Sequence, residues 1–98
     1  MAMLHIIRNS GFTSSALTQC LDMILPQDSI VLIDDGCYNL NHTLLLKTLT
    51  EQRDITVYFI SLHADARAQR TTNSLFIATT LTEVVALLFK HNNSITWS

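Results

Sequence analysis

The sequence predicts an α/β fold, a small open and mostly parallel sheet of about five strands with helices on both faces. Short apolar runs rich in β-branched residues alternate along the chain with segments of helical periodicity. Residues 30–33 form an unbroken apolar run, which is typical of a strand buried on both faces of a parallel sheet. The length of 98 residues fits a single domain that spans residues 1–98.

Each predicted element rests on its own local pattern. The expected strands are residues 3–7, 30–33, 55–61, 75–79 and 95–97. The expected helical segments are residues 14–25, 41–53, 64–69 and 81–90. Pro26 ends the first helix, and a turn is expected at residues 92 and 93.

The buried faces of two helices follow from the same periodicity. Leu44, Leu45 and Leu49, with Thr48 as a further candidate, are expected on the inner face of the second helix. Thr80 and Glu83 have the spacing of a capping box and so introduce the last helix. We expect that helix to be mostly buried through its aliphatic residues, Val84, Val85, Leu87 and Leu88.

Composition limits the class of protein. Hydrophobic residues make up 48% of the chain, enough for a core, whereas charged residues make up only 14%, below the usual ~25%. We therefore expect another subunit to cover part of the surface. The net charge is −2 and the six Lys and Arg residues are scattered, so direct binding of nucleic acid is not predicted.

Location is predicted from what the chain lacks. No apolar run approaches the ~20 residues needed to span a bilayer, so no membrane partner is expected. The first residues lack the features of a signal peptide. Two cysteines without a CxxC motif are typical of reduced thiols, and we expect a cytoplasmic protein.

Residues 34–38 place a candidate site at the end of the second strand. Asp34, Asp35 and Gly36 indicate a turn, and Gly36 is able to take a positive φ there. In open α/β sheets the functional crevice lies outside the carboxyl ends of the strands. Cys37 and Tyr38 follow the turn and would lie at that edge.

Each cysteine has a functional and a structural interpretation. Cys37 would be accessible in such a loop, where helix amides lower the pKa of a thiol and nearby aspartates raise it. Cys20 lies between Leu17 and Ile24 in an apolar helical stripe, so a buried structural thiol is the simpler interpretation. The alternative is a thiol that accepts or passes sulfur.

No cofactor or metal is predicted. The four histidines, His5, His42, His63 and His91, are too far apart in the sequence for local metal-ligand spacing. With only two glycines there is no phosphate-binding loop, so a nucleotide-binding function is disfavoured. Trp97 is expected either to pack on the core of its own chain or to contribute to a subunit interface, as is Tyr38.

Taken together, several short segments resemble the TusB/DsrH family. A start of the form MLHxxxxS is present as MLHIIRNS at residues 3–10, and an apolar strand runs into IDDG at residues 33–36. VYFI at residues 57–60 precedes DAR at residues 65–67, and KH at residues 90–91 precedes the terminal Trp97. The resemblance extends over nearly the whole chain.

This resemblance implies a DsrE/F/H-like fold and a role as the smallest subunit type of a sulfur-relay complex. It implies a cytoplasmic heterohexamer with TusC- and TusD-like subunits, which passes persulfide sulfur toward 2-thiolation of the wobble uridine in tRNA. In DsrEFH complexes the transfer serves sulfur oxidation instead. The main persulfide cysteine would belong to the TusD/DsrE-type subunit, so this chain would be an accessory subunit and not an enzyme by itself.

The same resemblance marks one thiol. Ser14, Leu17, Cys20 and Leu21 match the DsrH pattern Ser-x-x-Leu-x-x-Cys-Leu, whereas Cys37 has no counterpart in the family. The alternative hypothesis is an independent persulfide carrier that uses Cys20 or, less favoured, Cys37. Alone, the chain should expose apolar surface and associate as a two-fold homodimer.

Overall fold

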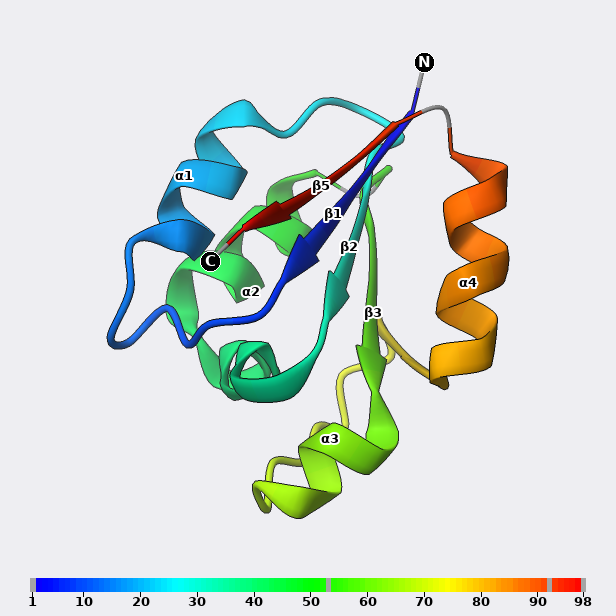
Figure 1. Cartoon of the computed structure of the whole chain (residues 1–98). Coiled ribbons are helices and arrows are strands. Elements are labelled where there is room, and N and C mark those ends of the chain that lie inside the picture. The colour runs from blue at the N-terminus through cyan, green and yellow to red at the C-terminus, as the bar shows by residue number, and fades with distance from the viewer. Residues whose placement is uncertain (1, 53, 92, 98) are drawn as a thin grey trace.

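In a computed structural model of the chain, which describes residues 2–52, 54–91 and 93–97, an all-parallel sheet of five strands forms the centre (Figure 1). Its order is β4-β3-β2-β1-β5. The strands are β1 (Met3–Ile7), β2 (Ser29–Leu32), β3 (Thr56–Ile60), β4 (Phe76–Thr79) and β5 (Asn93–Trp97). The predicted fold class is confirmed, and the sheet is parallel throughout.

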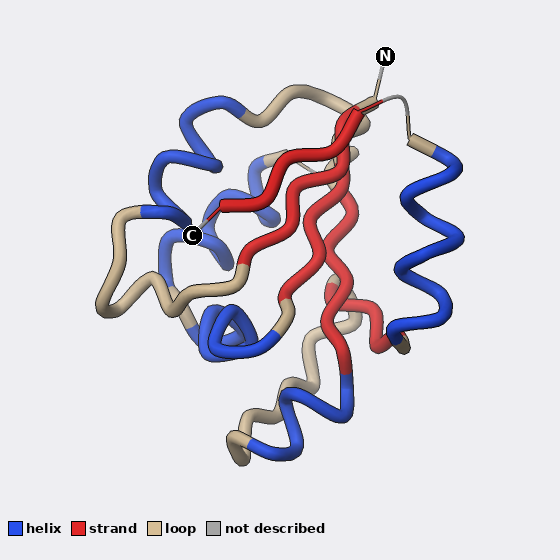
Figure 2. The backbone as a smooth tube through the Cα atoms, viewed as in Figure 1, coloured by secondary structure: helices blue, strands red, loops and turns tan. Residues whose placement is uncertain are grey.

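Helices cover the two faces unequally. Helices α1 (Ala16–Met23) and α2 (Thr43–Glu51) lie on one face, and α4 (Leu81–Lys90) lies alone on the other (Figures 1 and 2). The 3₁₀ helix η1 (Asp34–Asn41) and the short α3 (Ser61–Ala66) follow β2 and β3 at the carboxyl edge of the sheet. One face of the sheet is therefore better shielded than the other.

The centre of the core is β2, as its sequence predicts. Ile30, Val31 and Leu32 are all fully buried. Because side chains alternate across a strand, Ile30 and Leu32 join the larger core cluster, which includes Leu17 and Leu45. Val31 points to the opposite face and belongs to a smaller cluster with Leu4, Ile60 and Val84. The larger cluster also contains both cysteines.

A chain of hydrogen bonds connects the middle of β1 to the residue before β2 and to the end of β5. His5 and Asp28 are only 1% and 2% exposed, and His5 Nε2 lies 2.9 Å from Asp28 Oδ2. On the other side of the ring, Trp97 Nε1 donates to His5 Nδ1 at 3.1 Å. Trp97 thus packs on its own core, as one of its two interpretations predicted.

Asp28 is ionised because its donors outweigh its burial. Burial by itself raises the pKa of Asp28, but the hydrogen bond from His5 and those from the Met3 and Leu25 amides hold that pKa below its usual value. The Leu25 amide is free to donate because α1 ends at Met23, two residues earlier than predicted. Ile24 already has an extended backbone, so Pro26 lies beyond the end of the helix.

Other element boundaries also differ from the prediction. Residues 34–41 form a 3₁₀ helix where a turn was expected, and α2 begins at Thr43 because the ring of His42 accepts the Leu44 amide at 3.2 Å. Helix α3 starts at Ser61, directly after β3, and β5 already includes Asn93. The expected helix end at residue 53 and the turn position at residue 92 lie outside the described residues.

The prediction of a mostly buried last helix is wrong. Val84 is buried and Leu87 half-buried, but Val85 and Leu88 are 52% and 39% exposed. A single helix on an open sheet has no lateral neighbours, so only one stripe of side chains is covered. Leu44 on α2 is likewise exposed, contrary to expectation, although Leu45 and Leu49 are buried. Thr80 is confirmed as the N-cap residue of α4, because its Oγ1 accepts the Glu83 amide at 3.2 Å, and the Glu83 carboxylate lies 3.4 Å from the same hydroxyl.

Candidate functional site

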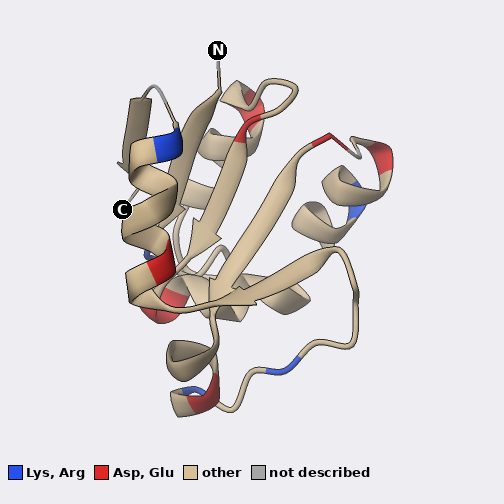
Figure 3. Ribbon diagram, turned by 90° about the vertical axis from the view of Figure 1, so that its right-hand side faces the viewer, with Lys and Arg blue, Asp and Glu red and all other residues tan. Residues whose placement is uncertain are grey.

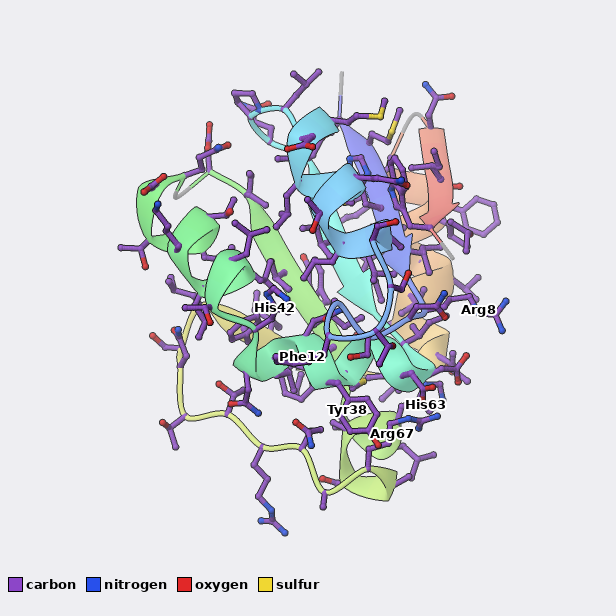
Figure 4. All side chains as sticks on the ribbon, turned by 90° about the vertical axis from the view of Figure 1, so that its left-hand side faces the viewer. Arg8, Phe12, Tyr38, His42, His63 and Arg67 are labelled. Carbon is purple, nitrogen blue, oxygen red and sulfur yellow. The ribbon has the colours of Figure 1, made fainter. Side chains whose placement is uncertain are left out.

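The carboxyl edge of the sheet gathers polar side chains from three consecutive strand ends. Arg8 follows β1, Asp34 and Asp35 begin η1 after β2, and His63 and Arg67 belong to α3 and its end after β3. Parallel strands present their carboxyl ends on one side, so these segments meet. Figure 4 shows Arg8, His63 and Arg67 at this edge, with Tyr38 beside them. We refer to these six side chains, Arg8, Asp34, Asp35, Tyr38, His63 and Arg67, as the edge cluster.

Ion pairs neutralise the charges of the edge cluster. Arg67 Nε donates to Asp35 Oδ1 at 2.7 Å, and its Nη1 donates to the carbonyl of His63 at 3.2 Å. The bond to Asp35 raises the pKa of Arg67 further above its usual value. Arg8 Nε lies 3.6 Å from Asp34 Oδ2 in a more open pair. Two cations thus face two anions, which leaves no net positive charge to bind an anion.

His63 holds the backbone of Asp34 in place. Its Nδ1 accepts the Asp34 amide at 3.0 Å, so the neutral ring carries its proton on Nε2. Asp34 has a φ of 49°, the left-handed conformation that non-glycine residues seldom adopt. The Asp34 carboxylate Oδ1 lies 3.7 Å from the same ring nitrogen. His63 therefore supports a strained residue at the exit of β2.

Gly36 has a different role from the one predicted. Neither glycine has a positive φ, and the left-handed position in this turn is Asp34. Gly36 is needed because η1 passes close to β1, where a Cβ at this position would overlap the carbonyl oxygen of Ile7. The requirement is for space and not for backbone conformation.

Cys37 lies beneath the edge cluster and is not accessible. Its side chain is fully buried, and its thiol donates weakly to the carbonyls of Leu32 and Ile60 at 3.6 and 3.8 Å. Burial raises the pKa of Cys37 to about 11, opposed by the charge of Arg67 and reinforced by Asp34 and Asp35. The accessible thiol that the functional interpretation of Cys37 needs is not present, because η1 turns Cys37 inward between β2 and β3.

Cys20 is also buried, as its structural interpretation predicted. It is fully covered in the core beneath α1. Burial raises the pKa of Cys20 to about 12, and the negative charge of Asp28 adds to the effect. Cys20 comes from a different element and does not join the edge cluster. Both thiols of this chain are therefore buried, and the pKa of each is raised well above its ordinary value.

The remaining predicted residues divide between the surface and the core. Tyr38 is half-buried and does lie at the carboxyl edge, whereas Trp97 packs inward against His5. Sequence reasoning missed Arg8, His63 and Arg67 as members of one cluster. Arg8 follows the last residue of β1 directly, and His63 lies three residues after β3. These positions just after predicted strands could have indicated that both side chains lie at the carboxyl edge of the sheet.

The edge cluster, which the structure describes in full, has no arrangement of side chains that could bind a metal ion. Within residues 2–52, 54–91 and 93–97, no three histidine, cysteine or acidic side chains come together in a way that could hold a metal ion. The paired arginines and aspartates offer hydrogen bonds and matched charges to a neighbour. In the same part of the chain, no helix has the length and hydropathy needed to cross a membrane.

Fold and site together define a small α/β protein with a parallel sheet and a polar carboxyl edge over a buried thiol. The sequence matches the model of the family described as DsrH like protein over residues 9–94. The chain therefore belongs to the DsrH-like family, and the resemblance to TusB/DsrH is confirmed. Family membership places it among the DsrH/TusB-type subunits of multi-subunit sulfur-relay complexes.

Two solved structures share the fold. The crystal structure of the ychN protein from E. coli aligns with a TM-score of 0.77 at 18% identity, covering 99% of this chain and 100% of that one. The solution structure of protein Tm0979 from Thermotoga maritima aligns with a TM-score of 0.59 at 22% identity, covering 92% and 93% of the two chains. A search of curated protein sequences finds no match.

Proposed function

We propose that this chain is an accessory subunit of a cytoplasmic sulfur-relay complex, mainly structural in its role. Its partners are TusC- and TusD-like subunits in a heterohexamer that passes persulfide sulfur toward 2-thiolation of the wobble uridine in tRNA. The observation that carries this proposal is the burial of both thiols in a chain of the DsrH-like family.

The chemistry of persulfide transfer explains why burial matters. A thiolate attacks the outer sulfur of a donor persulfide, the S–S bond breaks, and the donor leaves as a thiolate. This step needs an accessible thiol with a substantial ionised fraction. Cys20 and Cys37 have pKa values of about 12 and 11 and no exposed surface. The reacting thiol is therefore assigned to a partner subunit.

Apolar surface next to the edge cluster supports docking of a partner there. Leu62 on α3 is 72% exposed and Leu81 at the start of α4 is 55% exposed. Between them lies a cavity of about 180 Å³ whose lining also includes Ile60 and Thr80. Apolar contacts next to matched charges are the usual make-up of a specific protein interface.

Affinity purification tests the proposal. The full chain, tagged and expressed at its native level, should recover TusC- and TusD-like proteins in equal amounts, identified by mass spectrometry. A double variant, Cys20→Ala with Cys37→Ala, should still recover them, and cells that carry it should retain thiolated tRNA. Purification of the chain without either partner, or loss of tRNA thiolation in the folded double variant, would overturn it.

An alternative is that Cys20 itself carries a persulfide, as an independent carrier or as a DsrH-type subunit in sulfur oxidation. The match of residues 14–21 to the DsrH pattern favours Cys20 over Cys37 for this role. Incubation of the isolated chain with a cysteine desulfurase and cysteine should then add the mass of one sulfur atom. If neither cysteine gains that mass, the alternative is excluded for the chain alone.

A further inference from the structure

The outer side of α4 exposes apolar side chains that no other part of the described chain covers. Val84, Leu87 and His91 point toward the sheet, where His91 Nε2 reaches Ser29 Oγ at 3.1 Å. At 3.6 residues per turn, the opposite stripe of the helix consists of Thr82, Ala86 and Phe89, with Val85 next to it. Phe89 is 88% exposed and Val85 is 52% exposed.

Two opposite charges border this stripe on one side. Glu83 and Lys90 are the two charged residues of α4, and seven positions, or two helical turns, separate them. Figure 3 shows one acidic and one basic segment near opposite ends of α4, on the same side of the helix. Both residues, with Ala86, line one shallow cavity beside α4. Neither forms an ion pair with any residue that the structure describes.

We propose that the outer face of α4 is a two-fold interface with a second copy of this chain, in which the two α4 helices run antiparallel. A two-fold axis that passes beside Ala86 places Glu83 of each copy next to Lys90 of the other. The same operation places Phe89 of each copy over Val85 of the other. One rotation therefore satisfies both the exposed apolar residues and the unpaired charges.

The pattern favours a second copy in this orientation over other occupants. Parallel α4 helices would place Glu83 against Glu83 and Lys90 against Lys90, which is repulsive. A small residue at the centre, Ala86, allows the two backbones to approach. The surface is self-complementary in charge, as an isologous contact requires. This interface does not depend on the sulfur-relay function, and the chain would use it with or without other subunits.

Exchange of charges gives a direct test by sedimentation equilibrium of the isolated full chain at low salt. The wild type should form a concentration-dependent dimer, because a contact centred on one ten-residue helix is small. Glu83→Lys or Lys90→Glu alone should weaken the dimer about tenfold, since each creates two like-charge pairs. Mixed together, the two single variants should associate, because every pair is then opposite in charge.

Controls separate the interface from folding. Phe89→Ser should abolish the dimer, whereas Met23→Ser, which removes a 60% exposed side chain from α1 on the other face of the sheet, should not. Reversed charges oppose the dipole of α4, so circular dichroism melting must show each variant folded. The proposal would be overturned if the wild type stayed monomeric, if Phe89→Ser left the dimer unchanged, or if the mixed variants did not associate. Association only with other subunits through this face would also overturn it.

Discussion

The indole Nε1 of Trp97 donates a hydrogen bond to His5 Nδ1 at 3.1 Å and thereby ties the last strand to the first. The two rings also stack with their centroids 6.3 Å apart. Because His5 Nδ1 accepts this bond, the ring donates from Nε2 to Asp28. The edge strand β5 is thus held by the hydrogen bonds from Trp97 through His5 to Asp28, as well as by its backbone pairing with β1.

Loss of the indole N–H should loosen this anchor. Trp97→Phe leaves the aromatic packing largely in place but leaves His5 Nδ1 without a donor, which should lower the free energy of unfolding by about 1–3 kcal/mol. Urea denaturation followed by circular dichroism measures the change. Tyr38→Phe is the control, because no hydrogen bond to the Tyr38 hydroxyl occurs in the described part of the chain. Equal stabilities of the two variants would contradict the role given to Trp97.

Asp28 should make the protein sensitive to acid. Its folded pKa is below the ordinary value of 3.8 for an aspartate, so its contribution to stability is complete well above pH 3.8 and is lost as the pH falls from there through the folded pKa. Asp28→Asn should be less stable than wild type at pH 7 and should lose less stability on acidification. Asp22→Asn, on the exposed side of α1, should keep the wild-type profile. Parallel acid profiles for wild type and Asp28→Asn would show that Asp28 is not the responsible group.

Both thiols should react slowly in the folded chain. A pKa of about 11 for Cys37, against an ordinary value of 9.0 for a cysteine thiol, lowers its thiolate fraction at pH 8 by about a hundredfold, and burial restricts access further. Cys20, with a pKa of about 12, should react more slowly still. Iodoacetamide labelling followed by peptide mass spectrometry measures both rates, and the urea-unfolded chain is the reference. Labelling of either cysteine at the unfolded rate would contradict its buried position.

The two glycines should differ in tolerance to alanine. Gly36→Ala places a Cβ against the backbone carbonyl of Ile7, which cannot move without disturbing β1, so a loss of at least about 2 kcal/mol is expected. At Gly11 the new Cβ meets the side chains of Leu17, Asn39 and His42, which can shift. Gly11→Ala is therefore expected to cost less. Thermal unfolding of both variants tests the order, and a larger loss for Gly11→Ala would reverse the argument.

Most of the fold could be predicted because its signals are local. The β-branched run at residues 30–33, the periodicity of residues 81–90 and the Thr80–Glu83 capping box each depend on near neighbours in the sequence. Alternation of strand and helix then favours a parallel sheet by general packing rules. Boundaries were less accurate where a side chain binds backbone groups at the end of an element, as at the end of α1, where the Asp28 carboxylate accepts the Leu25 amide.

The sequence by itself determined the fold class, the succession of strands and helices along the chain and the inward position of Cys20, because hydrophobic spacing encodes them. It also pointed to the family through the resemblance of several short segments. Tertiary structure alone decided that Cys37 is buried, that Asp34 instead of Gly36 takes the positive φ, and that Arg8, His63 and Arg67 meet at one edge. It also decided that α4 has an open outer face. These features depend on contacts between segments far apart in the sequence, and such contacts leave no periodic trace in any one of them.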